Sequence, residues 1–140
     1  MEFARADDPL NKASTILLVD DSEGSREVIA AILARAGYTV LEAPNGSDAA
    51  QILDRDPGTV DLLITDAQMP GMTGPELVRH TRRLHPLTRV LCISGQPLDV
   101  TLPISTPFLQ KPLDLKLLLS KVREILLEER ILPAPSAATA

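Results

Sequence analysis

Short apolar runs alternate along this chain with segments in which apolar residues recur at helical spacing. Five segments are strand-like, at 15–19, 38–43, 60–65, 89–93 and 107–110. Four segments have helical spacing, at 28–36, 49–53, 77–84 and 115–126. Because the longest runs have no polar face, the strands need cover on both sides. The pattern therefore predicts an α/β fold with a parallel sheet between layers of helices.

Residues with turn and capping chemistry mark the ends of these predicted helices. Gly37 is placed to stop the first helix, and Ser47 or Asp48 can cap the second. Pro75 suits the first turn of the third helix, and Asp114 can cap the last. The pattern thus predicts where each helix begins or ends as well as its presence.

The segment at 95–106 does not follow the alternation of strand and helix. Pro97 could start a helix, but Pro103 disfavours the helical conformation at Leu102, so the widest helical window is 97–101. Apolar residues alternate here instead, at Leu98, Val100, Leu102 and Ile104. We therefore predict an extended segment over the sheet edge, a fourth helix that is short or absent, and mobility above the average of the fold.

Composition limits the classes of function. The chain has 140 residues, of which 44% are hydrophobic and 24% charged, as in an ordinary soluble domain. We expect one domain at 15–130, with flexible tails at 1–14 and 131–140. A net charge of −5 and an aromatic content of 2% argue against direct nucleic-acid binding.

The single cysteine and the short apolar runs limit the setting of the protein. One cysteine excludes an internal disulfide framework, and Cys92 lies within an apolar run, which indicates a small buried hydrophobe. The apolar runs are far below the ~18 residues of a membrane helix, and the first residues carry no apolar signal region. The sequence predicts a cytoplasmic protein without membrane contact.

Polar residues follow the predicted strands. Asp20, Asp66, Ser94 and Lys111 lie at or just after the ends of four of them, and Asp21 follows Asp20. In a parallel sheet these ends share one edge, where ligands bind. Each residue alone is more often a turn former, a helix cap or a surface lysine. Their joint placement predicts one functional rim.

This rim has a definite chemistry. Two like charges about 4 Å apart repel by roughly 4 kcal/mol at an effective dielectric near 20, so three converging aspartates need a cation or a raised pKa. Carboxylate oxygens without His or Cys favour Mg²⁺. Aspartate can also carry a phosphoryl group, and Lys111 and Ser94 supply a cation and a hydroxyl for its oxygens.

Four stretches resemble the receiver domain of response regulators in two-component signalling, namely 16–21, 66–74, 93–95 and 108–112. The resemblance covers about 15–130. It implies a flavodoxin-like (βα)5 doubly wound parallel sheet with strand order 2-1-3-4-5.

The resemblance also implies roles for particular residues. Asp66 corresponds to the phosphoacceptor. Asp20, Asp21, Asp66 and the backbone carbonyl of Gln68 correspond to the Mg²⁺ ligands. Lys111 takes the place of the lysine that meets the phosphoryl group, which makes it the third member of a catalytic set with Asp66 and Ser94.

Further positions correspond to the switch and to the control of its lifetime. Ser94 stands at the switch hydroxyl and Phe108 at the switch aromatic, which here has no hydroxyl of its own. Lys111 and Pro112 lie where the family often has a cis peptide bond. Gln68 and Gln96 fall where side chains tune how fast water attacks the acyl phosphate.

Two hypotheses about function remain open at this point. The leading one is a phosphorelay module that receives a phosphoryl group from a histidine kinase or a histidine phosphotransfer protein and then switches a surface for a downstream protein target. The alternative is a phosphorylation-independent interaction domain of the same fold. The chain is either a stand-alone receiver or the receiver part of a hybrid sensor kinase.

Other classes of function fit less well. A phosphatase with an aspartyl-phosphate intermediate needs a second acid where Gln68 stands, so we expect self-phosphorylation and autodephosphorylation but no turnover of an external substrate. The loop after the first strand is too acidic to cradle the phosphate of a flavin. The segment after Arg130 is too short for a DNA-binding helix-turn-helix.

Overall fold

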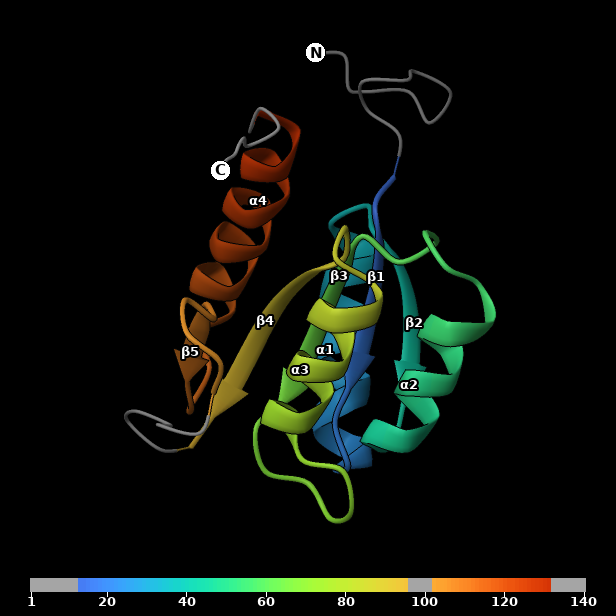
Figure 1. Ribbon diagram of the computed structural model, residues 1–140. Coiled ribbons are helices and arrows are strands. Elements are labelled where there is room, and N and C mark those ends of the chain that lie inside the picture. Colours follow the sequence, from blue (N-terminus) through green and yellow to red (C-terminus); the bar gives the residue numbers. More distant parts are fainter. Residues whose placement is uncertain (1–12, 96–101, 132–140) are drawn as a thin grey trace.

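The computed structural model describes residues 13–95 and 102–131 and contains a five-stranded parallel sheet in the order β2-β1-β3-β4-β5 (Figure 1). The strands are β1 (Thr15–Val19), β2 (Thr39–Ala43), β3 (Leu62–Asp66), β4 (Arg89–Ser94) and β5 (Phe108–Gln110). The helices are α1 (Glu23–Arg35), α2 (Gly46–Arg55), α3 (Gly74–Leu84) and α4 (Leu115–Ile131). The predicted fold class and strand order are confirmed.

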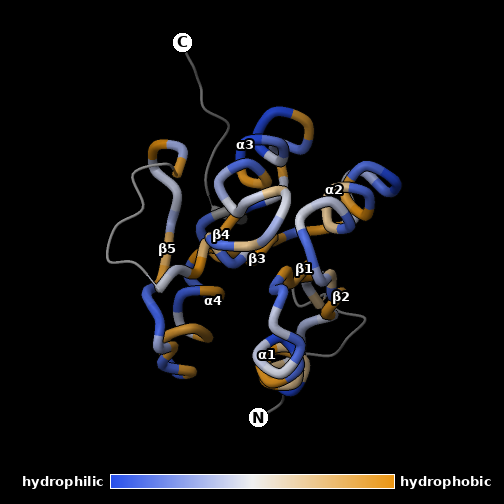
Figure 2. The backbone as a smooth tube through the Cα atoms, turned by 90° about the horizontal axis from the view of Figure 1, so that it is seen from below, coloured by the Kyte–Doolittle hydropathy of each residue, from blue (hydrophilic) through white to orange (hydrophobic). Residues whose placement is uncertain are grey.

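The sheet lies between two helical layers, with α2 and α3 on one face and α1 and α4 on the other (Figure 2). Alternate side chains of β1 enter different cores. Ile16 and Leu18 pack with the residues of α1 and α4, whereas Leu17 and Val19 pack with those of α2 and α3. All four are at most 1% exposed. The unbroken apolar runs of the sequence therefore reflect burial on both faces of the sheet.

The predicted strands match the observed ones closely. The run at 15–19 is β1 without any change, and the other strands differ from their predicted ranges by one or two residues at an end. The largest difference is at β3, which begins at Leu62, although Asp61 just before it already bonds to the chain at both neighbouring strands. Its backbone N–H donates to the Thr15 carbonyl, and its carbonyl accepts from Arg89 N–H, both at 2.9 Å.

Most helix boundaries follow the predicted chemistry. Gly37 adopts φ 106° just beyond α1, and the Asp114 carboxylate accepts hydrogen bonds from two backbone N–H groups of α4. The predicted cap of α2 is wrong. Asn45, rather than Ser47 or Asp48, is the N-cap, and its side-chain oxygen accepts from Asp48 N–H at 2.7 Å.

The described residues between β4 and β5, which are Gly95 and 102–107, form no helix. The window at 97–101 and Gln96 lie outside the described residues, so the predictions made for them stay predictions. Leu102 packs against the core on the side of α2 and α3, but the expected extended chain ends before Ile104, which is 88% exposed in a turn. Arg82 holds this turn by donating to the carbonyls of Ile104 at 2.7 Å and Ser105 at 3.1 Å.

Within the described residues, no helix is long and apolar enough to cross a membrane. Residues 1–12 and 132–140, which make up most of the predicted tails at 1–14 and 131–140, lie outside those residues, and the domain limits at 15 and 130 remain predictions.

The loop after β3 returns to the end of that strand through a close backbone contact. Gly74 begins α3, and its N–H donates to the Ala67 carbonyl at 3.0 Å. A Cβ atom at Gly74 would lie 2.3 Å from the Asp66 carbonyl oxygen and 2.7 Å from Ala67 Cα. Only glycine therefore lets α3 begin this close to the chain at Asp66.

We expect Gly74→Ala to lower the free energy of unfolding by about 1–3 kcal/mol, because the backbone must move to relieve the overlap. Gly24→Ala is the matched control, since a Cβ there has no neighbour within 4 Å and alanine favours the helix. Urea unfolding of both variants measures the difference. Equal stabilities for the two variants would contradict the role given to Gly74.

Candidate functional site

The carboxyl ends of the strands bring the predicted rim residues together. Asp20 follows β1, Asp66 ends β3 and Ser94 ends β4. Lys111 follows β5, and its backbone N–H donates to the Ser94 carbonyl at 2.7 Å. In the described structure, the peptide bond between Lys111 and Pro112 is cis, as predicted.

Three carboxylates converge at this rim. One oxygen each of Asp20, Asp21 and Asp66 lies within 4.8 Å of the others. Asp20 and Asp66 are 3% and 8% exposed, whereas Asp21 faces solvent. Two charged groups are therefore withdrawn from water while the third remains accessible.

Asp20 is held by its surroundings at both its side chain and its backbone. Its Oδ1 accepts from the backbone N–H of Ser22 at 2.9 Å. Its carbonyl accepts from the Arg26 guanidinium at 2.8 Å, and the same guanidinium pairs with Glu42 at 3.2 Å. These contacts fix the backbone of the acidic loop against α1.

Lys111 is the cation of the site. Its Nζ lies 3.2 Å from Oδ2 of Asp66, and its side chain is 36% exposed. Lys111 thus reaches a buried carboxylate while its ammonium stays in contact with water.

Burial raises the pKa of Asp66, and the charges of Asp20 and Asp21 add to that rise. The Lys111 ammonium opposes it by charge and by hydrogen bonding. Without a further cation, the ionised form of Asp66 is therefore disfavoured, and the site attracts positive charge.

Residues 16–123 match the family described as the response regulator receiver domain. This chain is a member of that family. The match takes in the whole sheet except Thr15, and about the first half of α4.

Similar proteins include receivers within kinases and receivers that make up nearly a whole protein. The receiver domain is 38% identical over 122 residues to the sensor kinase CckA of Brucella abortus (strain 2308), a match that covers 84% of this chain but only 13% of CckA. It is 32% identical over 118 residues to the response regulator receiver protein CpdR of the same organism, covering 80% of this chain and 96% of CpdR.

Solved structures agree with this assignment. The receiver domain of the hybrid histidine kinase CckA is 39% identical, with a TM-score of 0.72, and the match covers 81% of this chain and 99% of that one. A response regulator receiver domain protein from Clostridium thermocellum has a TM-score of 0.78 at 23% identity, which supports the fold alone.

The remaining predicted residues of the receiver domain lie around the rim in different environments. Ser94 is fully buried at the end of β4. Phe108 is half-buried at the start of β5, where it pairs with Cys92, itself buried as predicted. Gln68 is exposed in the loop after β3 and lines a hollow that extends to the first turns of α3.

The rim chemistry fits Mg²⁺. The three side chains offer carboxylate oxygens, and the buried pair leaves negative charge without full hydration. The exposed Asp21 leaves an open path from solvent to the site. Histidine and cysteine, which zinc prefers, are missing from this three-residue group.

Sequence reasoning missed two supports of the site. One is Arg26, which donates to the Asp20 carbonyl. In the sequence, nothing distinguishes it from an ordinary polar residue on the exposed face of a helix. Thr73 and Glu76 form a capping box that starts α3, with Thr73 N–H donating to Glu76 at 2.9 Å and Glu76 N–H donating to Thr73 at 3.2 Å. The spacing of Thr and Glu was a signal that could have identified this box.

We expect Asp66→Asn to stabilise the metal-free protein at neutral pH, because it removes one of three crowded charges. Because folding raises the pKa of Asp66, this residue favours the folded state fully below its unfolded-state pKa, and that contribution is lost as the pH rises through its folded-state pKa. The increase in stability of Asp66→Asn over the wild type should therefore be greatest at neutral pH, with a rise in Tm of roughly 4 °C for about 1 kcal/mol. It should vanish below about pH 4, where the carboxyl group is protonated.

Thermal unfolding in a chelator, measured from acid to neutral pH, tests this expectation. Asp56→Asn removes an exposed carboxylate beyond the end of α2 and serves as the control. A lower Tm for Asp66→Asn than for the wild type at pH 7 would contradict the electrostatic account of the rim.

Proposed function

We propose that this receiver domain accepts a phosphoryl group on Asp66 from a histidine kinase or a histidine phosphotransfer protein, in a Mg²⁺-dependent reaction. The main support is the position of the Lys111 ammonium 3.2 Å from Asp66, beside three carboxylates that converge within 4.8 Å. This arrangement combines a nucleophile, a cation and a metal-attracting group at one exposed edge.

The proposed step transfers phosphorus from nitrogen to oxygen. A carboxylate oxygen of Asp66 attacks the phosphorus atom of a phosphohistidine, a P–O bond forms and the P–N bond breaks. The electron pair of that bond stays on the imidazole nitrogen, which takes up a proton. In the separate step of dephosphorylation, water attacks the phosphorus, the P–O bond to Asp66 breaks, and inorganic phosphate and the free carboxylate are released.

Side chains of the rim have separate roles in this step. Lys111 holds negative charge that develops on the phosphoryl oxygens, and the Ser94 hydroxyl donates a hydrogen bond to one of them. Asp20, Asp21, Asp66 and the backbone carbonyl of Gln68 would hold Mg²⁺. When bound, Mg²⁺ neutralises the carboxylates and draws the phosphoryl oxygens toward them.

The phosphoryl group on Asp66 then carries a charge of about −1.5 to −2, in place of the single negative charge of the carboxylate. Ser94 and Lys111 lie at the ends of β4 and β5, so a contact with the new group pulls on both strand ends. Phe108 belongs to β5 and has no hydroxyl, so any change in its position must come from packing. We infer that a downstream protein reads this edge of the fold.

The same chemistry argues against turnover of an external substrate. Gln68, two residues after Asp66, cannot donate or accept a proton as a second acid does. Self-phosphorylation and autodephosphorylation are the expected reactions.

We expect Asp66 to be the only phosphoacceptor. Incubation with acetyl phosphate or phosphoramidate and Mg²⁺ should add one base-labile phosphoryl group to the wild type, detected by intact-protein mass spectrometry. Asp66→Asn should acquire none, and Asp56→Asn should react like the wild type. Equal labelling of Asp66→Asn would refute the assignment, and no labelling of the wild type would favour the phosphorylation-independent interaction domain.

We expect millimolar Mg²⁺ to raise the Tm of the unphosphorylated protein, because an ion that binds only the folded state stabilises it. The gain is about 2.7 kcal/mol at a hundredfold excess over Kd. Asp21→Ala should abolish most of the rise, whereas Asp56→Ala should retain it. A wild-type Tm that does not respond to Mg²⁺ in differential scanning fluorimetry would speak against the metal site.

A further inference from the structure

A second cluster of ligating side chains lies at the other end of the fold. It consists of Asp54 near the end of α2, His80 in α3 and His85 just beyond α3. Helices α2 and α3 run antiparallel to the strands and lie side by side on one face of the sheet (Figure 1). Their final turns therefore lie away from the carboxyl ends of the strands, where Asp66 is found.

Both histidines direct the same ring atom to one carboxylate oxygen. His85 Nε2 lies 2.6 Å from Oδ1 of Asp54, and His80 Nε2 lies 3.0 Å from that oxygen. The ring centres are 6.0 Å apart at an interplanar angle of 45°. Two imidazoles and a carboxylate from two helices thus converge on a single point.

The backbone holds the cluster in place before any ion binds. His85 is the C-cap of α3, and its N–H donates to the Thr81 carbonyl at 2.6 Å. The His85 carbonyl in turn accepts from Thr88 N–H at 3.0 Å. These two hydrogen bonds hold the backbone of His85 where the helix ends, and its imidazole ring is directed back toward Asp54.

Exposure decreases from the carboxylate to the histidines. The side chain of Asp54 is 47% exposed, that of His80 17% and that of His85 8%. An ion can therefore enter beside Asp54 and keep a water ligand on that side. The two imidazoles line the protected side of the site.

The separations of the three atoms suit a tetrahedral metal. Metal–ligand bonds of about 2.0–2.1 Å place neighbouring ligands of tetrahedral zinc about 3.3 Å apart. To reach this value, the His80–Asp54 separation of 3.0 Å must widen by about 0.3 Å and the His85–Asp54 separation of 2.6 Å by about 0.7 Å. Such a change is within the reach of small side-chain rotations.

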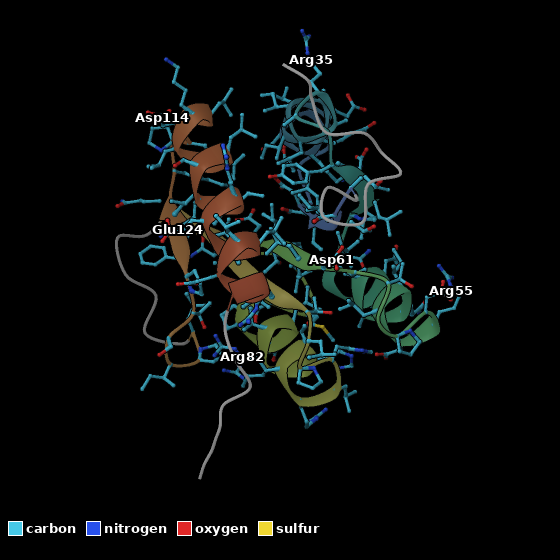
Figure 3. All side chains as sticks on the ribbon, turned by 90° about the horizontal axis from the view of Figure 1, so that it is seen from above. Arg35, Arg55, Asp61, Arg82, Asp114 and Glu124 are labelled. Carbon is cyan, nitrogen blue, oxygen red and sulfur yellow. The ribbon has the colours of Figure 1, made fainter. Side chains whose placement is uncertain are left out.

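The charges nearby permit a cation at this point. Asp54 brings a carboxylate oxygen to the point where the two imidazole nitrogens meet. Seen from this end of the molecule, Arg55 points outward from α2, and Arg82 lies on the side of α3 toward the β4–β5 segment (Figure 3). Neither arginine is directed at the cluster.

We propose that Asp54, His80 and His85 form a site for a transition-metal cation of the zinc class, which clamps the end of α2 to the end of α3. Imidazole nitrogen is a preferred ligand of zinc and a poor one for Mg²⁺. The site is thus chemically distinct from the acidic rim and does not depend on the function proposed for Asp66.

Calorimetric titration of the untagged 140-residue chain, freed of transition metals, with ZnCl₂ in millimolar Mg²⁺ tests the proposal. We expect one zinc per chain in the low-micromolar range and a rise in Tm. His80→Gln and His85→Gln should each weaken binding at least about tenfold, because even the loss of a residue that only supports a ligand costs about 10–100-fold. Binding of Co²⁺ should give visible d–d absorption that both variants reduce.

Asp56→Asn removes a carboxylate two residues from Asp54 and should leave zinc binding unchanged, whereas Asp54→Asn should weaken it. Asp66→Asn should also bind zinc normally while losing phosphorylation, which separates this proposal from the function of the rim. If His85→Gln does not fold, the less buried His80→Gln decides. Absence of zinc binding, or binding that Asp66→Asn abolishes and both histidine variants retain, would overturn the proposal.

Discussion

Parallel pairing of the strands is the constraint on which both ends of this molecule depend. Because all five strands run the same way, their carboxyl ends meet at one edge, and the helices that return the chain end at the opposite edge. Asp20, Asp66 and Lys111 meet at the first edge although they are far apart in the sequence. Asp54 and His85 meet at the second by the same rule. Within the described residues, an apolar core thus separates these two polar clusters.

The carboxylate edge combines opposing electrostatic effects. Burial of Asp20 and Asp66 beside Asp21 is unfavourable without a counter-charge, and Lys111 supplies only part of it. The fold holds this arrangement with backbone contacts, such as the hydrogen bond of Ser22 to Asp20 and the close approach of Gly74 to the Asp66 carbonyl. Stability from the apolar core therefore maintains a site in which like charges remain close together. The repulsion between these carboxylates favours the binding of cations and makes the site responsive to added charge.

The strands of the sheet could be predicted well because each one is marked by a pattern within a few consecutive residues. Continuous apolar runs mark strands buried on both faces, and a polar residue at or just after the end marks four of the five strands. The four stretches shared with receiver domains then indicated the strand order and the residues of the rim. The Asn45 cap was missed because Asn, Ser and Asp are all good caps and only the backbone geometry selects one of them. Similarly, Arg26 could not be assigned because its partners, Asp20 and Glu42, lie on different elements.

The pairing of Asp54 with two histidines was also beyond sequence reasoning. His80 is 26 residues from Asp54, and their contact depends on how α2 and α3 pack on the sheet. The regular spacing of apolar residues predicts helices and strands, but it does not predict a contact between two polar residues so far apart in the sequence. Long-range polar contacts of this kind follow from the fold and become visible only when the helices are placed.

The hydrogen bonds of Arg82 have a mechanical consequence. One guanidinium holds two successive carbonyls, those of Ile104 and Ser105, so the chain entering β5 is tethered to the outer face of α3 as well as to β4. Sliding this chain along α3 would break both bonds together, whereas tilting α3 and the chain as one unit would break neither. The tether therefore couples the position of this turn to that of α3.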